Sequence, residues 1–144
     1  MTMKLRKTQI SADFIITISI ALIVFLAVFY IADNRNTALR SYEASLYAKQ
    51  EADRLALALN SIFIAGPNST GTIFFAGTLK DGTQYNLSLV PSKHTVNIEY
   101  DFEGLQRQHQ AGILTANVTG DLINMSGNLR LSSSEGGILV EKQQ

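Results

Sequence analysis

The sequence predicts an α+β protein in which a long hydrophobic N-terminal helix is followed by a small antiparallel, β-sandwich-like head domain. Three observations predict this fold class. All 10 glycines and both prolines of the 144-residue chain lie at or after Gly66, so the earlier residues lack the two strongest helix breakers. Residues 14–32 carry no charge. After Gly66, apolar and polar residues alternate in short runs separated by turn residues, as they do in half-buried strands.

The composition excludes several classes of function. The formal net charge is +0, which gives no indication of nucleic-acid binding. The absence of cysteine excludes disulfides, thiolate zinc sites and thiol catalysis. The sequence contains no EF-hand loop, no G-x-S-x-G motif and no glycine-rich phosphate loop, and His94 and His109 read as separate surface residues. We therefore predict a protein that is not an enzyme and that has no catalytic residue, metal site or cofactor.

The apolar segment 14–32 is the strongest single signal in the chain. As a helix it would rise about 28 Å, which matches the hydrocarbon thickness of a bilayer. Lys4, Arg6 and Lys7 precede it without an acidic residue between them, which predicts a single-pass membrane protein with a cytoplasmic N-terminus. A conventional secretory signal peptide fits less well, because the segment is long and Tyr30 occupies the place of a small residue before a cleavage site.

The helix is predicted to continue beyond the membrane to residue 65, because residues 33–65 are rich in good helix formers. Leu39, Tyr42 and Leu46 fall on one face of this stalk. The segment from Leu55 to Ile64, with Leu59 and Ile62, presents a different apolar face. We expect the lower face to pack against other copies of the chain and the upper face to complete the core of the β domain. A plain juxtamembrane stalk is the alternative.

The head domain is predicted from runs of alternating apolar and polar residues. Asp81-Gly82 lies between two such runs and is a strong β-hairpin signal. Turn residues separate the runs at Glu103-Gly104, 119–121 and 134–137. The predicted strands are 73–79, 84–89, 95–103, 113–118, 127–132 and 136–141. Six or seven short strands of this kind favour an antiparallel sandwich or a curled sheet.

Four Asn-x-Ser/Thr sequons occur in the half that we expect outside the cell, and they make the protein a possible glycoprotein. Asn86 and Asn117 are expected to point away from the core. The candidate N-glycosylation sites are Asn68, Asn86, Asn117 and Asn124.

Glu99, Asp101 and Glu103 line one face of one predicted strand. Three neighbouring carboxylates can bind calcium or act as acid and base. A solvated strand face, which also discourages pairing between sheet edges, is the simpler interpretation and the one we favour.

Asp13 stands directly before the apolar segment. The helix dipole favours an acid near a helix N-terminus, but it gives no reason for that acid to enter the apolar layer. An acid at membrane depth normally has a partner. Cleavage between Thr8 and Gln9 would create an ammonium group four residues before Asp13, and the ammonium of one copy could meet the carboxylate of another.

Residues 6–14, with the basic pair, Thr8, the stretch from Gln9 to Asp13 and then Phe14, resemble the class III signal peptide of archaeal type IV pilins and pilin-like proteins. The resemblance implies cleavage between Thr8 and Gln9 by a prepilin peptidase on the cytoplasmic side, with the apolar helix retained. It makes Asp13 the fifth residue of the mature chain, where the family keeps an acid. Two positions depart from the family pattern: Thr8 replaces the usual glycine or alanine, and Asp13 replaces the commoner glutamate.

The resemblance implies three parts: a leader at 1–8, a transmembrane and filament-core helix at 9–65, and an extracellular β head at 66–144. The expected function is a structural subunit of a cell-surface filament, with Gln9, Asp13 and Phe14 as assembly residues. The expected partners are other copies or other pilins, the prepilin peptidase and assembly machinery, and the membrane before assembly. The alternative is a minor pilin or a non-polymerising, membrane-anchored surface protein whose β head binds a glycan, an envelope component or a partner complex.

Overall fold

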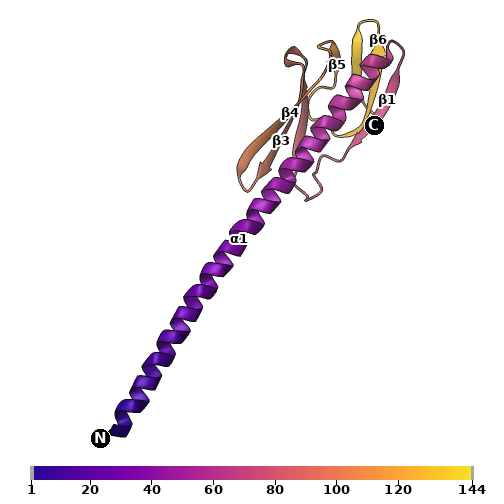
Figure 1. Ribbon diagram of the computed structural model, residues 1–144. Helices are drawn as coiled ribbons and strands as arrows, with labels where there is room; N and C mark the ends of the chain where they lie inside the picture. The colour runs from indigo at the N-terminus through magenta and orange to yellow at the C-terminus, as the bar shows by residue number, and fades with distance from the viewer. Residues whose placement is uncertain (1, 144) are drawn as a thin grey trace. The chain divides into compact units, whose positions relative to one another are not determined.

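The computed structural model describes the backbone of residues 2–143 and the side chains of residues 12–143. The architecture is α+β, as predicted, with one long N-terminal helix followed by a β-rich domain (Figure 1). The chain forms two compact units, residues 1–40 and residues 41–144. The elements are α1 (Thr2–Ala65), β1 (Thr70–Phe75), β2 (Tyr85–Val90), η1 (Pro91–Lys93), β3 (Thr95–Phe102), β4 (Leu105–Gly112), β5 (Val118–Gly120), β6 (Gly127–Ser134) and β7 (Gly137–Gln143).

The helix α1 ends where the first glycine of the chain predicts it. Gly66 has a φ of 87°, and its N–H donates to the carbonyl of Phe63 at 3.3 Å. A left-handed residue after the last helical turn is the usual helix terminator, and glycine adopts it without strain. Pro67 then prevents the helix from continuing.

The first unit is a helical segment whose apolar side chains are all exposed. Every large apolar side chain from Phe14 to Ile31 is more than half exposed. The helix is long and apolar enough to span a membrane. Its two aliphatic hydroxyl side chains bond back to the helix: Thr17 donates to the carbonyl of Asp13 and Ser19 to that of Ile15, both at 2.8 Å. The segment therefore presents almost no unsatisfied polar group to lipid.

The second unit contains two sheets. One has four strands in the order β1-β6-β7-β5, and the other has three in the order β2-β3-β4. Neighbouring strands are antiparallel, except that β5 runs parallel to β7. The last strand, β7, is thus an interior strand of its sheet.

Both sheets share one hydrophobic core with the last turns of α1 (Figure 1). Leu55, Leu59 and Ile62 are buried in this core, which confirms the prediction that the upper helix face completes it. Below them, Ala44, Ala48 and Ala52 are also buried. Alanine at every fourth position lets the backbone of a helix approach a neighbouring surface closely. The sequence reading missed this alanine stripe, because alanine is common on every face of a helix.

The predicted hairpin at Asp81-Gly82 is only partly correct. The turn forms: the N–H of Gly82 donates to the carbonyl of Leu79 at 2.9 Å, and Thr78 and Gln84 form an isolated bridge. The flanking strands, however, belong to different sheets, since β1 pairs with β6 and β2 pairs with β3. Gly77, with a φ of 75°, redirects the chain between the end of β1 and the turn.

The predicted strand 113–118 is wrong, and β4 was missed. Side chains accept two of the N–H groups of the 113–117 segment: the N–H of Leu114 donates to Asn60 Oδ1 at 2.8 Å, and that of Asn117 donates to Thr115 Oγ1 at 3.1 Å. The ladder resumes only at β5, which includes two residues that were predicted to form a turn. The missed strand β4 is an exposed edge strand that is polar on most positions, so its sequence lacks the alternation that marks a half-buried strand.

Candidate functional site

The predicted assembly residues lie on the first part of α1. The backbone of Thr8 and Gln9 is helical, but their side chains, and with them the predicted cleavage chemistry, lie outside the described residues. The side chains of Asp13 and Phe14 are exposed, Phe14 by 65%. Among the described side chains, no ion pair includes Asp13.

In the uncut chain, the helix dipole does not explain the position of Asp13. The helix begins at Thr2, so Asp13 lies about three turns inside it, whereas the favourable effect of the dipole on an acid is confined to about the first turn. An acid at this depth therefore has no local electrostatic reason to stand beside an apolar segment. Removal of residues 1–8 would bring Asp13 close to a new helix terminus.

A second set of apolar side chains is exposed on the stalk. Leu39, Tyr42 and Leu46, the predicted lower face, are exposed by 63%, 68% and 42%. In the second unit, Leu57 follows Leu46 by close to three helical turns, and Ile64 follows Leu57 by close to two. The three residues therefore share one face of the helix. Leu57 and Ile64 are exposed by 64% and 73%.

The four sequons lie in different environments. Asn68, Asn117 and Asn124 are exposed, whereas Asn86 is half-buried. The Oδ1 atom of Asn86 is buried and has no hydrogen-bond partner within the described residues. Asn86 and Asn117 were expected to point away from the core: Asn86 lies on the polar face of its sheet but is half-buried there, whereas Asn117 is exposed.

One face of the three-stranded sheet carries mainly polar side chains, arranged in rows across the strands, with Val90 at the end of β2 as the apolar exception. In the first row, Asn86 of β2 pairs with Glu99 of β3, which pairs with Gln108 of β4. In the row beside it, Asp101 pairs with Gln106. A further row on the same face contains Ser88, Asn97 and Gln110. We name the nine residues of the hollow at one end of this sheet the amide hollow: Gln84, Tyr85, Asn86, Glu99, Tyr100, Asp101, Gln106, Arg107 and Gln108.

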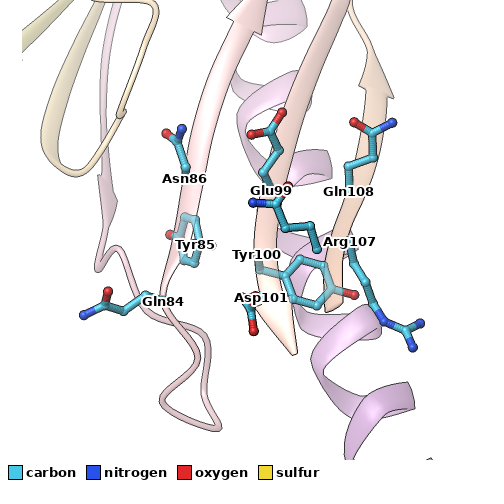
Figure 2. A pocket seen from close by; sticks show the side chains of 9 residues that line it. Gln84, Tyr85, Asn86, Glu99, Tyr100, Asp101, Arg107 and Gln108 are labelled. Atoms are coloured by element: carbon cyan, nitrogen blue, oxygen red, sulfur yellow. The ribbon is translucent and has the colours of Figure 1, made fainter. Parts of the chain in front are cut away.

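The amide hollow has a volume of about 660 Å³, within the size range of small-molecule sites. Figure 2 shows that its side chains come from three neighbouring strands, with Asn86 on β2, Glu99 on β3 and Gln108 on β4. A smaller hollow of about 310 Å³ lies on the other side of β2 and shares Gln84, Tyr85 and Asn86 with it. Two adjoining hollows thus follow the β2 strand.

The polar groups of the amide hollow are partly fixed in place. Asn97 is 8% exposed, and its Nδ2 donates to Glu99 Oε1 at 2.9 Å, which holds the carboxylate on the sheet face. Asp101 Oδ1 accepts from the N–H of Gly104 at 2.8 Å in the β3–β4 turn. Burial, with the charge of Glu51 as a further cause, raises the pKa of the half-buried Tyr85 above its usual 10.0 and keeps its hydroxyl protonated.

On the opposite face of the same sheet, His109 connects β4 to the helix. Its Nε2 lies 2.9 Å from the hydroxyl of Ser45, and its ring stacks on Tyr100 with 6.2 Å between the ring centroids. Its interpretation as a surface residue is therefore wrong, although His94 is exposed. The ammonium group of Lys80 lies over the ring of Tyr47, with 5.3 Å between Nζ and the ring centroid, and makes a cation–π contact.

The three carboxylates of β3 and its turn do not converge. Glu99, Asp101 and Glu103 are all exposed, and the described residues include no group of three acidic or histidine side chains that could hold a metal ion. Two of them, Glu99 and Asp101, line the amide hollow. The sequence reading placed these two on one face but missed Gln106, Arg107 and Gln108, because it did not predict β4.

The turn predicted at Glu103-Gly104 could have indicated β4. In the structure both residues have a positive φ, of 53° and 79°, as a two-residue hairpin turn requires. A tight turn directly after a strongly alternating strand implies a partner strand, whatever the composition of the residues that follow.

The chain matches no protein-family model, and comparison with curated proteins and with solved structures found no similar chain.

Proposed function

We propose that this protein is the structural subunit of a type IV pilus-like filament on an archaeal cell surface, made by a single-pass membrane precursor. The observation that carries the proposal is the exposed apolar segment from Phe14 to Ile31, which continues without a break into a helix that ends in a β domain. Such a segment needs either lipid or other apolar helices around it.

The proposed mechanism is an exchange of environment. After cleavage between Thr8 and Gln9, the helix leaves the bilayer and packs against the same segment of other copies. The hydrophobic effect favours neither lipid nor protein strongly here, so close packing and polar contacts decide the association. The exposed apolar side chains of the stalk, Leu46, Leu57 and Ile64, would extend the contact beyond the membrane segment.

Asp13 selects the register in this mechanism. A carboxylate inside an apolar bundle is stable only when it is paired, so each copy must place Asp13 beside a cation of its neighbour. The ammonium group of Gln9 is the proposed partner. If Gln9 cyclises, it loses that charge, and the contact weakens.

The direct test combines electron microscopy of material sheared from cells with mass spectrometry of its protein. We expect thin filaments that contain this chain, with an N-terminal peptide that begins at Gln9. Membrane-bound chains that begin at Met1, in cells whose filaments lack the protein, would contradict the proposal.

The role of Asp13 is tested separately by Asp13→Ala and Asp13→Glu variants. The alanine variant is expected to be cut and retained in the membrane but to form few or no filaments, while the glutamate variant keeps the charge and assembles. Cleavage is monitored by mass spectrometry, so that a processing defect is distinguished from an assembly defect. Normal filaments from the alanine variant would exclude the register mechanism.

A further inference from the structure

We propose that the amide hollow on the three-stranded sheet is a binding site for a neutral oligosaccharide. The inference goes beyond filament assembly, because it uses only residues of the second unit and holds equally for a chain that never polymerises. It rests on the side chains that line the hollow, on their fixed positions, on their charge and on the place of the hollow in the sheet.

The chemistry of the lining matches sugar hydroxyls. Four amides, of Gln84, Asn86, Gln106 and Gln108, offer both donors and acceptors, and the carboxylates of Glu99 and Asp101 offer acceptors. A hydroxyl is also a donor and an acceptor, so vicinal hydroxyls can bond to both ends of an amide. Tyr85 stays protonated, but strand alternation directs its side chain to the opposite, core-facing side of the sheet, so the amides and carboxylates supply the polar contacts.

Part of this hydrogen-bonding capacity is unused. The Oδ1 atoms of Asn86 and Asn97 are buried and have no partner within the described residues. Buried polar atoms are normally bonded, so these two acceptors lack the partner that such groups usually have. Asn86 lines the hollow, and Asn97 is held against Glu99 by the bond of 2.9 Å.

The carboxylates are positioned before any ligand arrives. Asn97 fixes Glu99, and the turn at Gly104 fixes Asp101 through bonds of 2.9 and 2.8 Å. The cross-strand register aligns Asn86, Glu99 and Gln108 in a single row. A ligand therefore meets a rigid array, which lowers the entropy lost on binding.

The charge of the hollow selects against anionic ligands. The lining contains the carboxylates of Glu99 and Asp101 and the guanidinium of Arg107, a net charge of −1. Phosphates, sialylated glycans and uronic acids would be repelled at this face. A divalent cation is a poor occupant as well, because the described residues bring no third acidic or histidine ligand near these two.

The location of the hollow argues against an extended peptide. Peptides add to a sheet at an unpaired edge, where backbone groups are free, and use apolar pockets for alternate side chains. The amide hollow lies across three strands, and the two rows at the hollow, Asn86–Glu99–Gln108 and Asp101–Gln106, contain no aliphatic residue. An oligosaccharide, which binds through its hydroxyls, needs neither feature.

The test uses the full-length protein in lipid nanodiscs, produced in a host without N-glycosylation, with empty nanodiscs as the blank. The probes are maltotetraose, cellotetraose, chitotetraose and a mannose tetrasaccharide, with sialyllactose and tetragalacturonate as anionic counterparts. Binding is detected by saturation-transfer difference NMR and quantified by calorimetry. We expect at least one neutral probe to bind with a dissociation constant of about 1 mM or lower and the anionic probes to bind less tightly.

Two variants locate the site, each with a matched control. Glu99→Gln removes the charge from the hollow, and Glu141→Gln removes an exposed charge from a strand of the other sheet. Gln108→Ala removes an amide from the hollow, and Gln110→Ala removes one two residues away on the same face and outside it. Each variant in the hollow is expected to weaken binding about tenfold, and each control to leave it unchanged.

The results that overturn the inference are equally definite. Failure of every neutral probe to bind, tighter binding of an anionic probe, or equal losses from hollow and control variants would each exclude it. Mass spectrometry of the native protein adds an independent test. A glycan found on Asn86 would occupy the hollow from the chain itself and would also contradict the inference. Circular dichroism of every variant verifies that the fold is retained, and Gln108, which is exposed, provides the variant least able to perturb it.

Discussion

Gly120 and Gly137 maintain the parallel pairing of β5 and β7 at positions that a larger residue does not fit. Their φ angles are 106° and 139°, in the region that favours glycine. A Cβ atom on Gly137 would collide with the carbonyl oxygen of Asn117, and one on Gly120 with that of Val140. The same carbonyls accept ladder bonds from Ile138 at 2.8 Å and from Asp121 at 2.9 Å. Neither glycine was distinguishable in the sequence from a turn glycine.

Gly137→Ala is therefore expected to lower the free energy of unfolding of the β domain by about 1–3 kcal/mol. The matched control is Gly112→Ala, because Gly112 is exposed, its φ is not positive and no heavy atom lies within 4 Å of an added Cβ. Thermal unfolding in detergent, followed by circular dichroism, measures both. Equal melting temperatures for the two variants would contradict this assignment.

The phenol of Tyr85 makes the stability of the β domain depend on pH in the alkaline range. Burial raises its pKa in the folded chain above 10.0, so the folded state binds the proton more tightly than the unfolded state. This contribution is fully present below about pH 10 and is lost as the pH rises through the higher, folded-state pKa.

Tyr85→Phe is expected to flatten the decline in melting temperature above pH 10.0, while the wild type loses stability there. Tyr42→Phe, at a side chain that is 68% exposed, is expected to follow the wild type. Titration of phenolate absorbance in the folded wild type should place Tyr85 among the last tyrosines to ionise. A decline of the same steepness in all three proteins would refute the link between Tyr85 and alkaline stability.

At the scale of elements, the sequence predicted those structures whose signal is local. The helix end at Gly66, the strands β2 and β3 and the turn at Asp81-Gly82 follow from breakers, alternation and turn residues. The strand β4 does not, because its mostly polar sequence lacks the alternation that marks a half-buried strand. The pairing of β1 with β6 does not either, because the two strands are more than fifty residues apart in the sequence. The amide hollow depends on β4, so only its half on β2 and β3 was predictable.

The last turns of α1 offer a matched pair of leucines that tests the division of its faces. Leu55 is fully buried in the core shared with both sheets, and Leu57 is 64% exposed. Leu55→Ala is expected to lower the free energy of unfolding by about 2–5 kcal/mol, since it leaves a cavity. Leu57→Ala is expected to change it by no more than about 0.5 kcal/mol. Denaturant unfolding of the detergent-solubilised chain measures the difference, and comparable losses would mean that the faces are assigned incorrectly.

At the scale of the whole molecule, composition and contacts divide the chain at different places. Glycine and proline begin at Gly66, which marks the end of the helix. The compact units instead divide after Arg40, because residues from Ala44 onward are buried in the core of the β domain. Composition could not predict this boundary, since the alanines that pack against the sheets are also good helix formers in water.

The apolar segment of α1 is long and apolar enough to span a membrane, and a charge placed in it tests whether it does so. Ile23→Lys places a charge at its centre, which costs about 2.5–3.5 kcal/mol in a membrane-spanning helix. We expect a large part of this variant to be extracted from membranes by alkaline carbonate, whereas Ile23→Leu stays in the pellet like the wild type. Immunoblots of pellet and supernatant measure the partition, and full retention of the lysine variant would argue against a spanning helix.

The order of the strands also sets a sequence of events in folding. Since β7 lies between β6 and β5, the four-stranded sheet cannot close until residues 137–143 have been synthesised. The strand β1 cannot pair earlier either, because its partner β6 lies more than fifty residues downstream in the sequence. The helix has only local hydrogen bonds, which form quickly, whereas the sheet depends on contacts between residues far apart in the sequence, which form more slowly.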